Sequence, residues 1–467
     1  MKQLFFVALL LAGTSTAFTQ TLKLNPEQQL LHDIYQQLIE INTTDSVGNC
    51  TAAAEAMAAR LKAAGFDEVR VLGPNERKGN LVARWRGTGA RKPLLLLAHL
   101  DVVEAKREDW SFDPFKLLEK DGYYYGRGTA DDKAMAAIFV ANLIRLKREG
   151  FKPDRDLILA LTADEEGGNF NGVDWLLKNH AQLLDAEFGL NEGGSGVLRQ
   201  GKKLFNAVQA SEKVYQSFLL ESKGKGGHSS RPVRDNVIYH LAAALGRLAQ
   251  FDFPVNLNEV TRAYFERVAQ IEGGEVGAAM KAITQNPPTA EAVAYLSNIP
   301  AYNATMRTTC VATMLEAGHA ENALPQTARA TVNCRILPTE TSEYVQQTLR
   351  QVIADNRITL TLIAPPKPSP PSPLRPDVLG AIERITAELH PGVPVVPVMS
   401  TGATDSLYLR KAGVPMYGVS GIFSDIDDSR AHGRDERVSV PAFYDGQEFL
   451  YRLVKTLATA APRQAVK

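Results

Sequence analysis

The sequence predicts an α/β fold, in which a doubly wound, mainly parallel sheet is interrupted by an inserted α+β domain. Two nearly continuous apolar runs, 93–101 and 156–164, are typical of parallel strands buried on both faces. Between them, 134–148 carries apolar residues at helical spacing and ends at Gly150, a residue suited to the left-handed turn after a helix. Strand, helix and strand in succession favour a doubly wound layer, whose sites lie beyond the carboxyl ends of its strands.

The same alternation of elements continues on both sides of this unit. Helices are expected over 51–64 and 173–184, each with small and apolar residues on one face. Near the C-terminus the pattern returns with a helix after Asp377, a strand over 414–420 and a last helix from Pro441. Both ends of the chain therefore contribute to one α/β layer.

The middle of the chain has a different pattern of apolar and polar residues. Alternating strands over 214–223 and 329–337, with amphipathic helices over 236–249 and 342–355, indicate a small sheet with helices on one face. Within it, 251–301 is an additional, mainly helical stretch to which the sequence assigns no role.

A proline-dense segment, 364–376, follows this middle region and is expected to be a semi-rigid connector back to the first layer. The whole sequence shows no internal repeat.

The charge balance argues against a nucleic-acid partner. The chain has 467 residues, and its 52 Lys and Arg residues equal its 52 Asp and Glu residues. Because no basic excess exists to gather phosphates, we expect no nucleic-acid partner. The 45% hydrophobic content is that of an ordinary globular protein with a sizeable core.

The N-terminus has the pattern of a signal peptide. Lys2 precedes an apolar run over 4–12, and small residues continue to Ala17. A membrane anchor is the alternative, but a span needs about 20 apolar residues and this run is far shorter. We therefore expect residues 1–20 to be removed from an exported protein, periplasmic or secreted, that has no membrane partner.

Three cysteines, Cys50, Cys310 and Cys334, allow at most one disulfide within the chain. A Cys310–Cys334 bond is one option. We favour the other, in which the thiols are free and buried.

Polar residues that can bind metal follow several predicted strands. His99 and Asp101 end the first apolar run, where one ring nitrogen of His99 can bind a metal while Asp101 holds the other. Asp131 and Asp132 precede a helix, and a carboxylate there could bridge two ions about 3.5 to 4 Å apart. The residues alone do not show whether Asp131 or Asp132 would be the ligand. An aspartate that only caps the helix is the ordinary alternative.

An acidic cluster, Glu165 and Glu166 with Asp164, leaves the second buried strand, where unpaired charges are costly. Metal ions can pair them, and one carboxylate can remain free to take a proton from water. Glu192 at a third strand end and His432 in a polar loop add further donors. The set contains no thiolate, which favours an open catalytic site for two zinc ions, with cobalt or manganese as alternatives.

Six motifs in order, H-L-D, G-R-G-T-A-D-D-K, D-E-E, N-E-G-G, G-G-H-S-S-R-P and A-H-G-R-D-E, resemble those of a known family. It is the di-zinc exopeptidase family that includes glutamate carboxypeptidase, carboxypeptidase S, succinyl-diaminopimelate desuccinylase and the carnosine dipeptidases. The resemblance covers nearly the whole mature chain.

The resemblance implies a role for each metal-binding candidate. Asp131 would bridge two zinc ions, with His99 and Glu192 completing one site. Glu166 and His432 would complete the other.

The same resemblance implies two residues that act beside the metals. Glu165 would be the general base, and Asp101 would orient His99.

Further residues are expected to act from the inserted domain and one loop. His228 would stabilise a tetrahedral oxyanion, often from the partner subunit of a homodimer, and Arg335 would grip a substrate carboxylate. Asn322 resembles a substrate-contacting asparagine, and Gly402 and Thr404 belong to a loop that lines the pocket.

The resemblance also divides the chain. A signal peptide at 1–20 would precede the first part of a catalytic domain at 21–206, a lid or dimerisation domain at 207–366 and the second catalytic part at 367–467.

The implied function is metal-dependent hydrolysis, of carboxypeptidase or dipeptidase type. The substrate would be a small peptide or N-acyl amino acid with a free carboxylate. A di-zinc aminopeptidase is one alternative, which the lid motif and Arg335 argue against. A catalytically inactive peptide-binding or dimerisation relative is another, and the presence of Glu165 argues against it.

Overall fold

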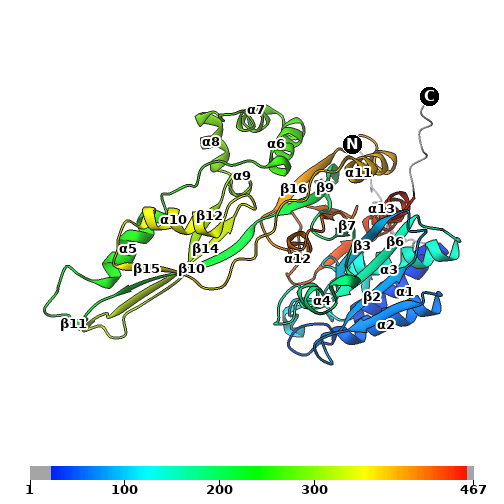
Figure 1. Cartoon of the computed structure of the whole chain (residues 1–467), viewed down its shortest axis with the longest axis horizontal. Helices are drawn as coiled ribbons and strands as arrows, with labels where there is room; N and C mark the ends of the chain where they lie inside the picture. Colours follow the sequence, from blue (N-terminus) through cyan, green and yellow to red (C-terminus); the bar gives the residue numbers. More distant parts are fainter. Residues whose placement is uncertain (1–22, 460–467) are drawn as a thin grey trace, which may run out of the picture.

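A ten-stranded sheet forms the centre of the larger part of the molecule (Figure 1). The computed structural model describes residues 23–459, so the predicted signal peptide at 1–20 lies outside the described residues. The strand order is β1-β2-β6-β3-β7-β17-β9-β8-β18, and β16 pairs with β9. The strands are β1 (Glu68–Leu72), β2 (Asn80–Trp85), β3 (Arg91–His99), β6 (Arg155–Thr162), β7 (Phe188–Asn191), β8 (Gly196–Arg199), β9 (Lys202–Glu212), β16 (Val395–Ser400), β17 (Met416–Gly418) and β18 (Phe423–Asp425).

The middle of this sheet is parallel and buried on both faces. Strand β3 runs parallel to β6 and to β7, and β7 runs parallel to β17. Within β3, Leu94 and Leu96 pack into one hydrophobic core, whereas Leu95 and Leu97 pack into another on the opposite face. This alternation explains why the strand has an almost continuous apolar sequence.

Helices cover both faces. One face is covered by α1 (Pro26–Glu40), α2 (Cys50–Ala63), α3 (Lys133–Arg148), α11 (Pro376–Leu389) and α13 (Val440–Leu457). The other face is covered by α4 (Gly172–His180) and α12 (Ser406–Lys411). The predicted doubly wound, mainly parallel α/β layer is therefore confirmed.

Two tertiary links hold the segments around α3 in place. The fully buried ammonium of Lys133, the first residue of α3, donates to the carbonyl oxygens of Leu38 at 2.9 Å and Ile41 at 2.8 Å. It thereby anchors the start of α3 to the end of α1. In a small sheet, β5 (Tyr123–Tyr125) pairs with β4 (Leu118–Lys120) and with β19 (Arg437–Ser439), which brings the C-terminal region beside the segment before α3.

The lid extends away from the central sheet (Figure 1). Its antiparallel sheet has the order β12-β14-β10-β15, formed by β10 (Val214–Lys223), β12 (Thr309–Ala317), β14 (Thr327–Ile336) and β15 (Ile358–Leu362). Helices α5 (Val237–Leu248) and α10 (Ser342–Ile353) pack on this sheet and share a separate hydrophobic core with it. A two-stranded ribbon, β11 (Gly227–His228) with β13 (Ala323–Leu324), lies at its far end. The exact domain boundaries remain our proposal.

The additional segment forms four helices, α6 (Glu259–Glu272), α7 (Gly274–Ile283), α8 (Ala290–Ser297) and α9 (Pro300–Met306). Their core, which includes Phe265 and Met280, also contains Val396 of β16. The four helices therefore pack on the central sheet at β16, whereas Phe253 at the start of the segment packs into the core of the lid.

One cysteine prediction is wrong. Cys310 and Cys334 form a disulfide, because β12 and β14 pair in a register that places these two residues directly opposite each other. Their Cα atoms are 4.1 Å apart. Cys50 is free and buried, as expected. Within residues 23–459, no helix is both long and apolar enough to cross a membrane.

Candidate metal centre

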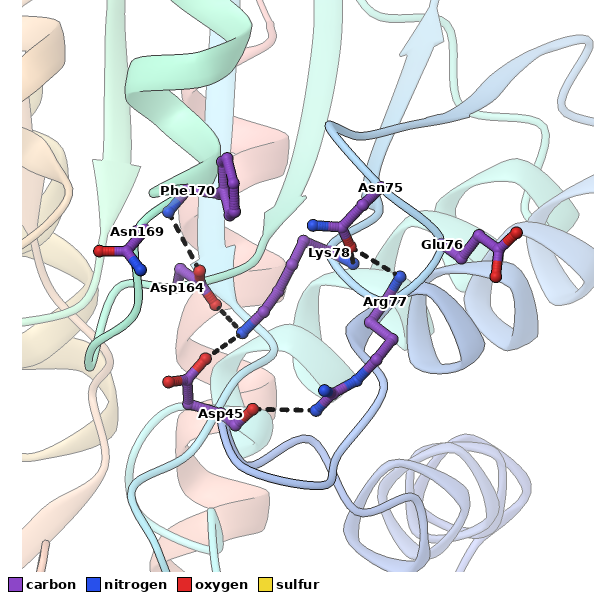
Figure 2. Close-up of a pocket in the computed structure, with 8 residues that line it drawn as sticks. All are labelled: Asp45, Asn75, Glu76, Arg77, Lys78, Asp164, Asn169 and Phe170. Carbon is purple, nitrogen blue, oxygen red and sulfur yellow. Dashed lines mark hydrogen bonds and ion pairs between the residues drawn. The ribbon is translucent and has the colours of Figure 1, made fainter.

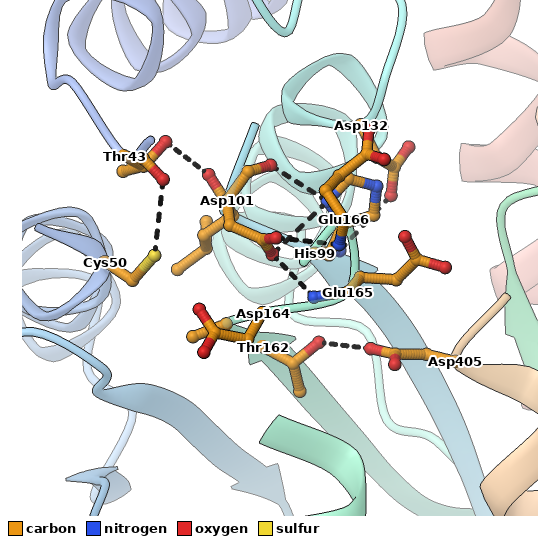
Figure 3. Close-up of polar contacts among 12 residues, drawn as sticks. Thr43, Cys50, His99, Asp101, Asp132, Thr162, Asp164, Glu165, Glu166 and Asp405 are labelled. Atoms are coloured by element: carbon orange, nitrogen blue, oxygen red, sulfur yellow. Dashed lines mark hydrogen bonds and ion pairs between the residues drawn. The ribbon is translucent and has the colours of Figure 1, made fainter. Parts of the chain in front are cut away.

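The carboxyl ends of three neighbouring strands bring the predicted site residues together. His99 ends β3, and Glu165 and Glu166 follow β6 (Figure 3). Glu192 directly follows β7. Because β6, β3 and β7 are adjacent and parallel, these ends meet at one edge of the sheet. The site thus arises from strand order, although its residues are far apart in the sequence.

Asp131 lies between two histidines. Its Oδ1 is 3.0 Å from Nε2 of His99, and its Oδ2 is 3.1 Å from Nε2 of His432. The same nitrogen of His432 is 2.7 Å from Oε1 of Glu166. Asp132 instead turns its Oδ2 toward the backbone N–H of His99 at 3.4 Å. This geometry favours Asp131 as a bridging carboxylate, a choice that the residues alone left open.

Two groups of side chains place their ligand atoms within 4.8 Å of one another. One consists of His99, Asp131 and Glu166, and the other of His99, Glu165 and Glu192. Imidazole and carboxylate donors without thiolates suit zinc and similar divalent ions in a catalytic site. Glu165 lies inside the second group, so distance alone does not distinguish a base from a ligand.

Three glutamates of this site have raised pKa values, whereas hydrogen bonds to His432 and His99 hold the pKa of Asp131 below its ordinary value despite its burial. Burial raises the pKa of Glu165 to about 9 and that of Glu166 to about 7, and it raises the pKa of Glu192 well above its ordinary value. A divalent cation among these groups would offset the cost of burying their charged forms. The enclosed acids therefore fit a metal centre.

The pKa values of the two histidines are also raised. Hydrogen bonding to Asp131 raises the pKa of His432 to about 9. Burial acts to lower the pKa of His99, but Asp101 and Asp131 hold it well above its ordinary value. Excess negative charge thus dominates the electrostatics around both rings.

Asp101 contacts the site through two kinds of atom. Its backbone carbonyl is 3.0 Å from Nδ1 of His99, whereas its Oδ1 is 3.6 Å from that nitrogen. The carboxylate instead accepts the backbone N–H groups of Glu165 at 3.1 Å and Glu166 at 2.9 Å. Asp101 therefore fixes the acidic loop in addition to the ring of His99.

A hollow of about 470 Å³ lies beside this acidic loop (Figure 2). Lys78 reaches from the turn between β1 and β2 and pairs with Asp164 and with Asp45. No local pattern around Lys78 indicates this role, because its partners are distant along the chain. The hollow is lined by Asp45, Asn75, Glu76, Arg77, Lys78, Asp164, Asn169 and Phe170.

Two predicted lid residues lie far from the candidate metal centre within one chain. His228 belongs to β11, at the end of the lid most distant from β3, β6 and β7 (Figure 1). Its Nδ1 is 2.7 Å from the hydroxyl oxygen of Ser230. Asn322 lies beside it and accepts the N–H of Ser229 through its backbone carbonyl at 3.0 Å. The structure therefore joins His228 and Asn322 to each other but not to the metal-binding groups.

Arg335 lies nearer the central sheet. Its guanidinium stacks 4.7 Å from the ring centroid of Tyr215 and donates to the carbonyl oxygen of Thr401 at 3.3 Å. It thus contacts the loop that contains Gly402 and Thr404.

Hydrogen bonds to Glu212 and Ser400 hold the loop that contains Gly402 and Thr404. Thr404 donates through its backbone N–H and its hydroxyl to Oε2 of buried Glu212, at 3.0 and 3.1 Å. The N–H of Gly402 donates to the hydroxyl oxygen of Ser400 at 3.0 Å. The hydroxyl of Thr404 is therefore engaged by Glu212, and the expectation that it contacts substrate stays a prediction.

The sequence assigned no individual role to Arg127 or Glu436, although both lie in quoted motifs, and it placed Asp405 only at the end of the pocket-lining loop. Asp405 is buried and accepts a hydrogen bond from the hydroxyl of Thr162 at 2.9 Å (Figure 3). It also accepts one from the amide of Asn171 at 2.6 Å. Burial raises its pKa to about 6.

The fold and the clustered donors together define a hydrolase of the metallopeptidase class. Residues 95–456 match the model of Peptidase family M20/M25/M40, and the chain belongs to this family. This confirms the predicted family, enzyme class and α/β fold.

Two relatives and one solved structure illustrate the similarity. The human N-fatty-acyl-amino acid synthase/hydrolase PM20D1 is 32% identical over 381 residues, which cover 79% of this chain and 74% of the relative. The probable carboxypeptidase S-like 2 of Dictyostelium discoideum is 30% identical over 388 residues, with coverage of 80% and 74%. The crystal structure of the M20 family metallo-carboxypeptidase Sso-CP2 from Sulfolobus solfataricus has a TM-score of 0.68 at 17% identity, covers 93% of this chain and 99% of that one, and shares the fold.

Proposed function

We propose that the protein uses two divalent metal ions to cleave the amide bond of an N-acyl amino acid or small peptide that carries a free carboxylate. The observation that carries this proposal is the position of Asp131, whose two carboxylate oxygens face His99 and His432 separately. The relatives' names, an N-fatty-acyl-amino acid hydrolase and a carboxypeptidase S-like protein, support the substrate class.

Five side chains would hold the metal ions, which we take to be zinc, with cobalt or manganese as alternatives. His99 and Glu192 would bind one ion, Glu166 and His432 the other, and Asp131 both. When bound, such ions polarise a carbonyl group and lower the pKa of water.

Glu165 would move the protons. Its carboxylate would take a proton from the attacking water and deliver it to the leaving amine, which is typically worth about 10² to 10⁴-fold in rate. The hydrogen bond from its backbone N–H to Asp101 supports this role, because it fixes the loop while the side chain stays close to His99.

Arg335 would bind the substrate carboxylate through its planar fork of donors. Its contact with the loop at Thr401 supports a position at the mouth of the site. His228 would stabilise the oxyanion, and its distance from the metal-binding groups of its own chain supports a donor that comes from a partner subunit (Figure 1).

The edge strand of the lid supports a homodimer. Three apolar side chains on β12, Val311, Met314 and Leu315, are 60%, 69% and 68% exposed. Among residues 23–459, strand β12 pairs on one side only, with β14. An exposed apolar edge of this kind is a template for pairing with another chain.

Export is the remaining part of this proposal. The predicted signal peptide at 1–20 motivates it, and the Cys310–Cys334 disulfide supports an oxidising compartment, where such bonds persist.

A metal-reconstituted screen tests the function. N-acyl amino acids and dipeptides are supplied with either a free or an amidated carboxyl group, with and without a chelator. We expect hydrolysis of the free acids, a marked loss on amidation and complete loss with chelator. Hydrolysis that depends on a free amino terminus and ignores amidation would instead identify an aminopeptidase. No hydrolysis by protein that holds two ions would indicate an inactive binding relative.

A further inference from the structure

Two of the expected metal ligands come from segments with little regular structure around them. Asp131 and His432 are 301 residues apart in the sequence. The side chain of His432 is 55% exposed, and the residue lies in a loop between β18 and β19 with a φ of 63°. Since a bridging site requires its ligands at a fixed separation, something must hold these two loops together.

Glu436, four residues after His432, binds the loop that carries Asp131. Its Oε1 accepts the backbone N–H groups of Ala130 at 2.7 Å and of Asp131 itself at 3.1 Å. Its Oε2 accepts the N–H of Gly128 at 3.0 Å. The Glu436 carboxylate thus replaces the partners that these N–H groups lack in an irregular loop.

Arg127 completes the connection in the opposite direction. Its Nη1 donates to Oε2 of Glu436 at 2.7 Å, and its Nη2 donates to the carbonyl oxygen of Gly433 at 2.9 Å, directly after His432. The guanidinium also lies 4.9 Å from the ring centroid of Trp110. Both charged side chains are buried, so their pairing is not weakened by solvent.

We propose that Arg127 and Glu436 form a buried clamp that sets the separation between Asp131 and His432 and thereby the affinity of the site that Asp131, Glu166 and His432 form. They are positioning residues, because neither directs a ligand atom toward the metal-binding groups. The inference rests on the proposed function, since it requires that these groups bind metal.

A purely structural ion pair would behave differently. Removal of one partner of any buried pair destabilises the fold, because the other charge is left uncompensated. A clamp must in addition weaken metal binding in protein that is still folded. Residues that hold metal ligands in place typically affect metal affinity by about 10 to 100-fold when they are mutated.

The test is Glu436→Gln, which preserves the size of the side chain but turns one acceptor into a donor that faces backbone N–H groups. Zinc stoichiometry and affinity are measured by equilibrium dialysis and calorimetry on the full chain, with unfolding followed in parallel. We expect wild-type protein to hold two ions, and the variant to bind one of the two about 10 to 100-fold less tightly.

Glu187→Gln is the matched control. Glu187 pairs with buried Arg155 at 3.0 Å, away from the metal-binding groups, so its loss should lower stability without changing zinc affinity. If Glu436→Gln does not fold, Arg127→Lys takes its place. A lysine keeps the charge but lacks the planar fork that fixes Arg127 between Glu436 and the carbonyl of Gly433, so a loss of affinity in the same direction is expected.

The outcomes separate the two proposals. Two ions bound with wild-type affinity by a folded Glu436→Gln or Arg127→Lys variant would overturn the clamp and leave the proposed function standing. A wild-type chain that binds neither zinc, cobalt nor manganese would overturn the proposed function, and the clamp with it. Equal losses of affinity in Glu187→Gln and Glu436→Gln would also overturn the clamp.

Discussion

Lys78 and Asp164 form a buried ion pair that ties the turn between β1 and β2 to the residue directly before Glu165 (Figure 2). Asp164 adopts a φ of 59°, and its Oδ2 also accepts the N–H of Phe170 at 3.2 Å. Its carboxylate therefore fixes a strained backbone position at the start of the acidic loop.

Lys78→Met should destabilise the protein, because it leaves the Asp164 carboxylate buried without its partner. We expect the free energy of unfolding to fall by about 3 kcal/mol in urea titrations. Replacing Asp164 by Asn in the same chain should recover part of this loss, since no unpaired charge remains.

Asp45→Asn serves as the comparison for Lys78→Met. Asp45 also pairs with Lys78, at 2.6 Å, but its side chain is exposed, so its loss should cost less than about 1 kcal/mol. Equal effects of Lys78→Met and Asp45→Asn would contradict the importance of the buried pair.

Glu165→Gln and Glu166→Gln should separate proton transfer from metal binding. The first should keep two ions per chain and lose about 10² to 10⁴-fold in kcat. The second should also lose metal, because Glu166 shares Nε2 of His432 with Asp131. Elemental analysis beside kinetics makes the comparison. Equal metal loss in both variants would show that Glu165 is itself a ligand, as its place in one donor group allows.

His228→Ala should lower kcat by about 10² to 10³-fold with less effect on KM if the ring stabilises the oxyanion. Mixing this variant with inactive Glu165→Gln should restore part of the activity, because some mixed dimers would pair an intact donor with an intact metal centre. No recovery after confirmed subunit exchange would falsify the donor from the partner subunit.

Arg335→Ala should raise the KM for substrates with a free carboxylate and narrow their advantage over amidated substrates.

Lys213 predicts a pH dependence of stability. Burial lowers the pKa of its ammonium to about 7, with Glu340 opposing and Arg335 reinforcing the shift. The unfolded chain therefore binds more protons than the folded one between about pH 7 and the ordinary lysine pKa, so this residue makes stability rise with pH in that range. Below pH 7 the full cost of burying the charge is present.

Urea unfolding at pH 6.5 and pH 9 measures this effect. Lys213→Met should show a smaller rise than wild type, by at most about 1.4 kcal/mol per pH unit. The exposed Lys202→Met is the control and should retain the wild-type rise. Identical pH profiles for wild type and Lys213→Met would show that the buried amine does not titrate in this range.

Local patterns were sufficient to predict the elements of the central layer. The expected strand over 156–164 corresponds to β6, and the expected helix over 134–148 differs from α3 by one residue. Apolar runs and helical spacing are properties of short segments, and burial in this sheet follows them closely. The metal-binding candidates could be predicted because motifs at strand ends have adjacent positions in a parallel sheet.

Contacts that depend on register or docking could not be predicted in the same way. The Cys310–Cys334 bond requires the pairing of β12 with β14, which neither strand encodes alone. Likewise, the helices after residue 258 each have an apolar face, but nothing in their sequence specifies Val396 as its partner. The backbone partners of the Glu436 carboxylate likewise lie more than 300 residues away along the chain, so no local pattern identifies them.

Strands β9 and β10 are separated by the single residue Lys213, whose N–H donates to the carbonyl oxygen of Ser400 at 2.9 Å. The ten residues of β10 form an arm of about 33 Å at the usual rise per residue of an extended strand. A swing of roughly 10° at its base would move the tip by about 6 Å, twice the length of a hydrogen bond. A small change of backbone torsion at Lys213 would therefore cause a large displacement of the ribbon formed by β11 and β13. We expect larger thermal motion at this ribbon than at the edge of the central sheet that carries the metal-binding groups.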